Sequence, residues 1–303
     1  MTIGTATPGV ENYGRGILLV ATAGLLWSSG GLLYRLVETA SDWQIVAWRT
    51  FFMGISAGVY VAWRYRRDAW GAIRRIGWWG VAGAVGLAVA NSAFIFSLSL
   101  TYVANALLIL AASPFIAAVL AWLLLRERVR RATVLAMALV IAGVAVMESG
   151  GFHSGRVFGD LLALLAVTGF ALFSVCVRAG RHGDMMPTVA VGGLFSVVVA
   201  STMVVIAGDS LLIGVRDFEI AFLMGFAQVF VGMTLYIFGA RHVPAAELAL
   251  LSLTEVVMGP LWVWLALNEI PVAHTFYGGA LVLVAVVINA MTGMRRRHPL
   301  PQV

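Results

Sequence analysis

Long apolar blocks separated by short polar connections run along the whole chain. Their approximate limits are 16–36, 45–63, 77–98, 102–125, 132–149, 157–177, 188–207, 218–238, 245–267 and 273–293. An apolar run of about 20 residues is long enough to cross a bilayer as an α-helix. The alternating segments of about ten residues that build a membrane β-barrel do not occur. The pattern therefore predicts an all-α polytopic membrane protein with ten transmembrane helices.

Composition supports this class and argues against metal chemistry. Of 303 residues, 61% are hydrophobic and 11% charged, whereas soluble domains carry about 25% charged residues. A single cysteine, Cys176, excludes an internal disulfide. The five histidines lie in loops or at the ends of the predicted spans, and none has zinc-site spacing. We therefore expect no metal, no cofactor and no catalytic residue, so that the chain is not an enzyme.

The arginines predict the orientation in the membrane. All 20 basic residues are arginines, and most of them precede the first span or follow the even-numbered spans, as in the loop 64–75. The positive-inside rule then places both termini in the cytoplasm, with short tails at 1–15 and 294–303. Because these arginines lie at helix ends, they are expected to set topology and not to bind nucleic acid. Four arginines fall on the other side: Arg35, Arg49, Arg156 and Arg216.

The sequence repeats itself at an offset of about 142 residues. The segment 120–127 resembles 262–269, Thr133 then falls on Thr275, and an offset of 143 carries Arg35 onto Arg178. The chain thus divides into two halves of five spans, 16–149 and 157–293. Five is an odd number, so the second half enters the membrane from the opposite side. Inverted repeats of this kind are typical of secondary transporters, whose substrate site lies between the repeats near the midplane.

The two fourth helices carry a family resemblance. Trp122, Leu125 and Glu127 end the first, and Trp264, Leu267 and Glu269 end the second. Two such five-helix halves resemble the drug/metabolite transporter superfamily of EamA type, over residues 14–294, and within it the YddG-type exporters of aromatic amino acids. The resemblance implies alternating access in a bacterial cytoplasmic (inner) membrane, with spans 1, 3, 4, 6, 8 and 9 lining the cavity. One departure is that the proline of the ninth span is displaced to Pro260.

The most informative single residue is Glu255, near the middle of the ninth span. A charge there costs about 2.5–3.5 kcal/mol on insertion scales, so it should face protein or water. Ser252, Gly259 and Trp262 share its helix face. We interpret this face as a cavity wall, with Glu255 as a substrate-amine ligand or proton carrier. The alternative is a structural acid bonded to a neighbouring helix.

Other candidates for the cavity are aromatic and amide side chains inside the spans. They are Trp27 and Tyr34 in span 1, Phe170 in span 6, and the amides Asn91, Asn105 and Gln228. Packing and interhelical hydrogen bonds are the alternative roles for this set. Pro114 and Pro260 each remove a backbone hydrogen bond, so we expect helix breaks at both.

The resemblance implies an exporter of aromatic amino acids, and these features fit that substrate class and other uncharged side chains such as methionine or threonine; we expect a monomer. Its partners would be the small-molecule substrate and the bilayer. Acidic substrates are disfavoured, because no interior arginine or lysine is expected to receive them. The alternative is an exporter of lipophilic cations or other small metabolites; a more distant one is a membrane-embedded enzyme. Proton-coupled and facilitative transport both remain open.

Overall fold

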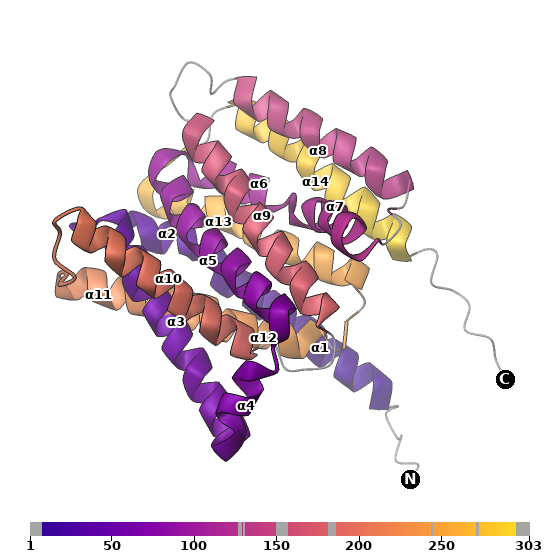
Figure 1. The fold of residues 1–303 in the computed structure, drawn as a ribbon. Coiled ribbons are helices and arrows are strands. Elements are labelled where there is room, and N and C mark those ends of the chain that lie inside the picture. The colour runs from indigo at the N-terminus through magenta and orange to yellow at the C-terminus, as the bar shows by residue number, and fades with distance from the viewer. Residues whose placement is uncertain are drawn as a thin grey trace, which may run out of the picture.

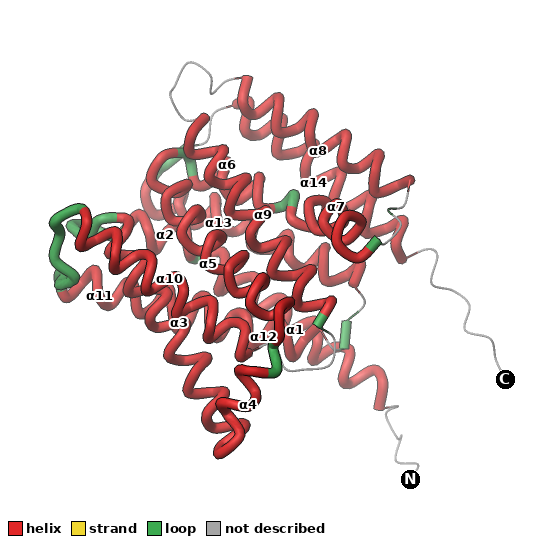
Figure 2. The backbone as a smooth tube through the Cα atoms, in the orientation of Figure 1, coloured by secondary structure: helices red, strands yellow, loops and turns green. Residues whose placement is uncertain are grey.

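A computed structural model of the chain describes residues 8–126, 129, 131–149, 157–180, 186–240, 242–243, 245–270 and 273–294. Throughout these residues the regular structure is helical and contains no strand (Figure 2). The first half comprises α1 (Pro8–Ser28), α2 (Gly30–Arg35), α3 (Asp42–Tyr65), η1 (Arg66–Asp68), α4 (Ala69–Arg74), α5 (Gly77–Leu100), α6 (Val103–Leu110), α7 (Ser113–Leu125) and α8 (Arg131–Ser149). The second comprises α9 (Val157–Ala179), α10 (Met186–Ile206), α11 (Val215–Phe222), η2 (Leu223–Val231), α12 (Gly232–Ala240), α13 (Ala245–Leu267) and α14 (Ala273–Met294).

The ten predicted spans each correspond to one helix or one interrupted helix of the structure. Seven helical stretches are long and apolar enough to cross a membrane, and three more are shorter apolar helices within the described residues. Large apolar side chains cover their outer surfaces, including Leu135, Ile141 and Val205, each more than 65% exposed. An apolar exterior of this extent fits a lipid-facing surface. α1 begins at Pro8, earlier than the expected start at residue 16.

Three of the spans are irregular where they pass the centre of the bundle. The first is interrupted at Ser29, between α1 and α2, and the fourth between α6 and α7. The second interruption confirms the expected break before Pro114, which lies in the first turn of α7, where a missing N–H costs nothing. The eighth span contains the π-helical turns of η2. The sequence pattern did not predict the Ser29 break or the π-helix.

The break expected at Pro260 was wrong, because α13 runs without interruption from Ala245 to Leu267. A proline removes one hydrogen bond, but neighbouring helices and local adjustment let membrane helices tolerate it. The preceding residue is Gly259, which lies against Leu107 and the Ser28 carbonyl. Close neighbours therefore pack against the turn of α13 in which Pro260 removes a hydrogen bond.

The two halves pack through matched pairs of helices (Figure 1). α3 packs on α10, and α8 packs on α14. α5 packs on α9 just as α1 packs on α12, and α7 packs on α9 just as α1 packs on α13. When helices of one half are exchanged for their counterparts in the other, the first two pairs are converted into themselves and the other four into one another. Thr133 and Thr275, equivalent in the sequence repeat, are both buried and both donate to an asparagine, Asn289 and Asn105 respectively.

Glycines allow the closest of these approaches. A Cβ on Gly169 of α9 would lie 2.6 Å from the Gly86 carbonyl oxygen of α5, and one on Gly193 of α10 would lie 2.5 Å from Cα of Gly54 in α3. Small residues at such crossings are a general device of membrane helix packing. Gly58, one turn beyond Gly54, has nothing within 4 Å of a Cβ position, so only Gly54 of this glycine pair serves helix packing.

Candidate functional site

A cavity of about 380 Å³ lies between the two halves, within the range of roughly 300–1,000 Å³ common for small-molecule sites. Side chains from α1, α5, α6, α7, α9, η2, α12 and α13 line it, so the six spans expected to form the cavity all contribute. α3 and α14 contribute as well, through Arg49 and Val286. The lining is mostly apolar and carries a small number of polar groups, which is the usual character of a ligand pocket.

Glu255 lies on this cavity, as its position in the sequence predicted. The side chain is partly buried and comes from the middle of α13. It accepts no hydrogen bond from the side chains and backbone that the structure describes. The alternative of a structural acid bonded to a neighbouring helix therefore finds no partner among these residues.

Arg49 is the main correction to the sequence analysis. It was assigned to the arginines outside the membrane, but it lies within α3 with only 4% of its surface exposed and lines the cavity. Its guanidinium stands 5.6 Å from the centre of the Phe94 ring, a cation–π contact. Glu255, of opposite charge, lines the same cavity. The expectation that no interior cation would be available to an anionic group is therefore wrong.

Aromatic side chains form much of the remaining wall. Trp27 and Phe170 line the cavity, as expected, and Trp27 packs against Tyr236 with ring centres 5.3 Å apart. The ring centres of Phe170 and Phe173, on the same helix, lie 6.1 Å apart. A Cβ on Gly232 would lie 2.5 Å from the Trp27 indole nitrogen, so this glycine makes room for the tryptophan. The wall is therefore suited to a flat apolar group.

Two of the three predicted amides reach the cavity. Asn91 lines it and donates to the Leu87 carbonyl at 2.9 Å. Gln228 in η2 donates to the Trp27 carbonyl at 3.2 Å, and its Oε1 is buried with no partner among the described residues. The π-helical turn thus presents an amide to α1 at the Ser29 break and leaves an acceptor free beside the cavity.

Three predicted site residues have structural roles instead. Tyr34 donates to Asp42, Asn105 accepts from Thr275 at 2.6 Å, and Trp262 donates to Ser28 at 3.0 Å. None of the three belongs to the cavity lining. Each is bound to another helical segment, because a polar group away from water needs a partner. Pro114 lines the cavity, Pro260 does not, and the side chain of Ser252 lies outside the described residues.

Several lining residues were not predicted. Besides Arg49 they include Phe94, Ser113, Ser174, Met233 and Tyr236. Ser113 directly precedes Pro114, and the others sit in apolar runs whose faces cannot be ranked from a single sequence. Arg49 did give a signal, since it interrupts the apolar run of a predicted span.

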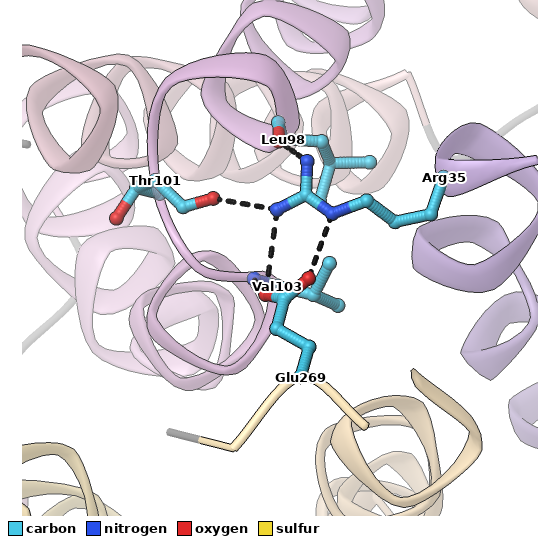
Figure 3. A network of polar contacts seen from close by, with 5 residues as sticks. All are labelled: Arg35, Leu98, Thr101, Val103 and Glu269. Carbon is cyan, nitrogen blue, oxygen red and sulfur yellow. Dashed lines mark hydrogen bonds and ion pairs between the residues drawn. The ribbon is translucent and has the colours of Figure 1, made fainter. Parts of the chain in front are cut away.

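An ion pair between Arg35 and Glu269 lies at the end of the bundle where α2 and α13 end (Figure 3). Arg35 donates from Nε to Glu269 at 2.8 Å and from Nη2 at 3.3 Å. It also donates to the carbonyls of Leu98 at 2.7 Å and Thr101 at 3.0 Å, while Glu269 accepts from the Val103 amide. Leu98 lies one turn beyond Phe94 on α5, about 6 Å along the axis. The network therefore joins the end of α2, the end of α5, the start of α6 and the segment after α13, about one turn from the cavity lining.

A second acidic residue fastens a loop at the same end. Asp217, at the start of α11, accepts from the backbone amides of Glu38, Thr39 and Ala40, each at 2.9 Å, and from the Thr39 hydroxyl at 2.7 Å. It is 1% exposed. The loop between α2 and α3 is thus fixed to the second half of the chain.

Comparisons with known proteins agree with this architecture. The profile of the EamA-like transporter family matches twice, at residues 14–149 and 157–291. No curated protein matches the chain. A solved structure titled only "Crystal structure of protein" superposes with a TM-score of 0.67 at 21% identity, covering 94% of this chain and 99% of that one; at this identity it supports the fold alone. Because the two profile matches cover most of its length, the chain belongs to the EamA-like transporter family of membrane transporters.

Proposed function

We propose that the chain exports amino acids with uncharged side chains across a bacterial cytoplasmic membrane, by alternating access and as a monomer. The observation that carries this proposal is the composition of the cavity wall. Trp27, Phe170 and Tyr236 offer flat apolar surface, while Glu255 offers a negative charge to an ammonium group. An amino acid with an aromatic or other uncharged side chain has both parts.

The arrangement of helices fits alternating access. The cavity lies between the halves, and its lining extends from Phe94 towards Ser174 and Tyr236, away from the Arg35–Glu269 pair. We infer that the halves are inverted repeats, because five spans in each require opposite directions and the helix pairs match on exchange. Rocking of such repeats about a central site is the usual mechanism of this class.

Flux into liposomes tests the proposal. Purified protein is reconstituted, and uptake of labelled tryptophan, phenylalanine, methionine, threonine, aspartate and lysine is compared with protein-free vesicles. We expect counterflow of the uncharged set, strongest for the aromatic members, and little of the charged ones. Absence of flux for every uncharged amino acid would refute the proposal. A Gly193→Leu protein, disrupted at the α3–α10 contact, is the inactive control.

The second candidate is export of lipophilic cations. It is favoured by one observation, a carboxylate beside aromatic rings, which suits a quaternary amine as well as an amino acid. Competition separates the two candidates. If tetraphenylphosphonium blocks tryptophan binding and is itself transported while tryptophan is not, the cation is the substrate.

A further inference from the structure

We propose that Arg49 is the carboxylate-binding residue of the cavity, and that Arg49 and Glu255 together hold the two charges of a zwitterionic α-amino acid. The inference rests on the proposed function and deepens it, because it assigns which end of the substrate each residue binds. It starts from the unsatisfied hydrogen-bonding capacity of a buried guanidinium.

Two of the three guanidinium nitrogens of Arg49 lack an acceptor within the described part of the chain. Its Nε and Nη1 are buried and have no hydrogen-bond partner among the described residues. Burying a charged group without partners is costly, because the group loses its water and gains nothing in return. A guanidinium carries five N–H donors in a planar fork that matches a carboxylate with two parallel hydrogen bonds. The free donors therefore form a ready site for a carboxylate on the cavity wall.

Arg35 is the natural comparison within the same protein. It belongs to the network with Glu269, and it donates to that carboxylate and to two backbone carbonyls. A structural arginine in this bundle is thus surrounded by acceptors. The Arg49 guanidinium stands over the face of Phe94, and its Nε and Nη1 find no acceptor among the described residues. This contrast argues for a role in binding and against a role in holding helices together.

Glu255 lines the same cavity as Arg49. The two residues carry opposite charges, yet among the described residues no contact within 4.0 Å pairs their charged atoms. They come from different halves of the chain, Arg49 from α3 and Glu255 from α13. A ligand with an ammonium and a carboxylate on one carbon can neutralise both groups at once, whereas an amine or an acid alone neutralises one. The aromatic wall then receives the side chain.

Three ligands with the same indole ring test the assignment: tryptophan, tryptamine, which lacks the carboxylate, and indole-3-propionate, which lacks the ammonium. Binding is measured by calorimetry on full-length protein in nanodiscs. For wild type we expect tryptophan to bind tightest, by about tenfold or more over either analogue, because charged hydrogen bonds are strong in a buried site. Equal affinities for tryptophan and tryptamine would overturn the proposal without any variant.

Variants then test which residue binds the carboxylate of the ligand and which binds its ammonium. Arg49→Gln should weaken tryptophan and indole-3-propionate by roughly 10- to 100-fold and leave tryptamine unchanged or tighter, since Glu255 loses its counter-charge. Glu255→Gln should weaken tryptophan and tryptamine and leave indole-3-propionate unchanged or tighter. Arg49→Lys keeps the charge but loses the planar fork of donors, so its affinity for tryptophan should fall to an intermediate value. If Arg49→Gln does not fold, Arg49→Lys serves as the folded variant. Equal weakening of all three ligands in both Arg49 variants would make Arg49 structural.

The outcome also separates this inference from the proposed function. Wild type that neither binds nor transports any uncharged amino acid refutes the function itself. Wild type that transports tryptophan, but whose Arg49 variants do not discriminate between tryptophan and tryptamine, refutes only the role of Arg49.

Discussion

Arg35 and Glu269 join the first half of the chain to the second through two hydrogen bonds, at 2.8 and 3.3 Å. The two side chains are 24% and 20% exposed, and the arginine holds the carbonyls at the end of α5 at the same time. A partly buried ion pair of this kind is expected to contribute more to stability than an exposed one. Arg75 and Asp68 also form an ion pair, but both are more than 60% exposed, where an ion pair contributes little.

Glu269→Gln should open this end of the bundle. The change keeps the size of the side chain and removes the charge, at a cost of about 1.5–3 kcal/mol for hydrogen bonds to a charged group. We expect a cysteine at Val103, which is 1% exposed, to react several-fold faster with a thiol reagent in a Cys176→Ser background. Asp68→Asn is the matched control and should leave the rate unchanged. An unchanged rate in Glu269→Gln would show that the pair does not hold this end closed.

Asp217→Asn should loosen the loop between α2 and α3. Asparagine accepts fewer hydrogen bonds than a carboxylate, and its N–H₂ group would face backbone donors. The thermal midpoint in detergent should drop, corresponding to about 1.5–3 kcal/mol for the loss of charged hydrogen bonds. Asp209→Asn is the control, because Asp209 is exposed. Equal midpoints for the two variants would contradict the anchoring role.

Gly193→Leu should destabilise the protein more than Gly58→Leu. The first side chain must enter the contact between α3 and α10, where the backbone of Gly54 already fills the space. Forcing atoms into a packed interface costs about 1–3 kcal/mol or more. The second glycine has open space around it, so its substitution should change the thermal midpoint little. A reversed order of the two midpoints would contradict the glycine contact.

The limits of the spans could be predicted from the sequence because the bilayer dictates length and apolarity. Glu255 could also be predicted, since an isolated charge in an apolar run has few acceptable environments. Arg49 was missed although it obeys the same logic, because arginines were interpreted as markers of topology. The partners of Tyr34 and Trp262 could not be predicted, because a hydrogen bond to another helix depends on how the helices rotate against each other.

The sequence repeat also predicted only part of the structure. It indicated equivalent positions, but it could not show that Glu269 meets Arg35, which lies in the other half of the chain. Its equivalent Glu127 lies outside the described residues. Helix irregularities were predicted only where proline marks them, and then in one case of two, because tolerance of a proline depends on what packs against it.

The positive-inside assignment predicts which ends of the bundle face the cytoplasm. Single cysteines at Arg67 and at Leu212, both exposed, are placed in the Cys176→Ser background and treated with an impermeant thiol reagent in intact cells. We expect labelling at position 212 and none at position 67 until the cells are lysed. Labelling at 67 but not at 212 would contradict the proposed orientation.

Glu255→Gln separates the two roles open to this carboxylate, because it keeps the volume of the side chain and removes the charge. If Glu255 binds the substrate ammonium, tryptophan affinity should fall by roughly 10- to 100-fold, and both net flux and exchange should fall with it. If Glu255 carries a coupling proton, exchange of tryptophan across the membrane should continue, while the dependence of net flux on an imposed pH gradient disappears. Both quantities can be measured in one set of liposomes, loaded with unlabelled tryptophan or buffered at unequal pH. Gln228→Glu, which places a carboxylate elsewhere on the same wall, tests whether position matters and should not rescue Glu255→Gln. Wild-type exchange together with a wild-type response to pH would show that the carboxylate only balances the charge of Arg49.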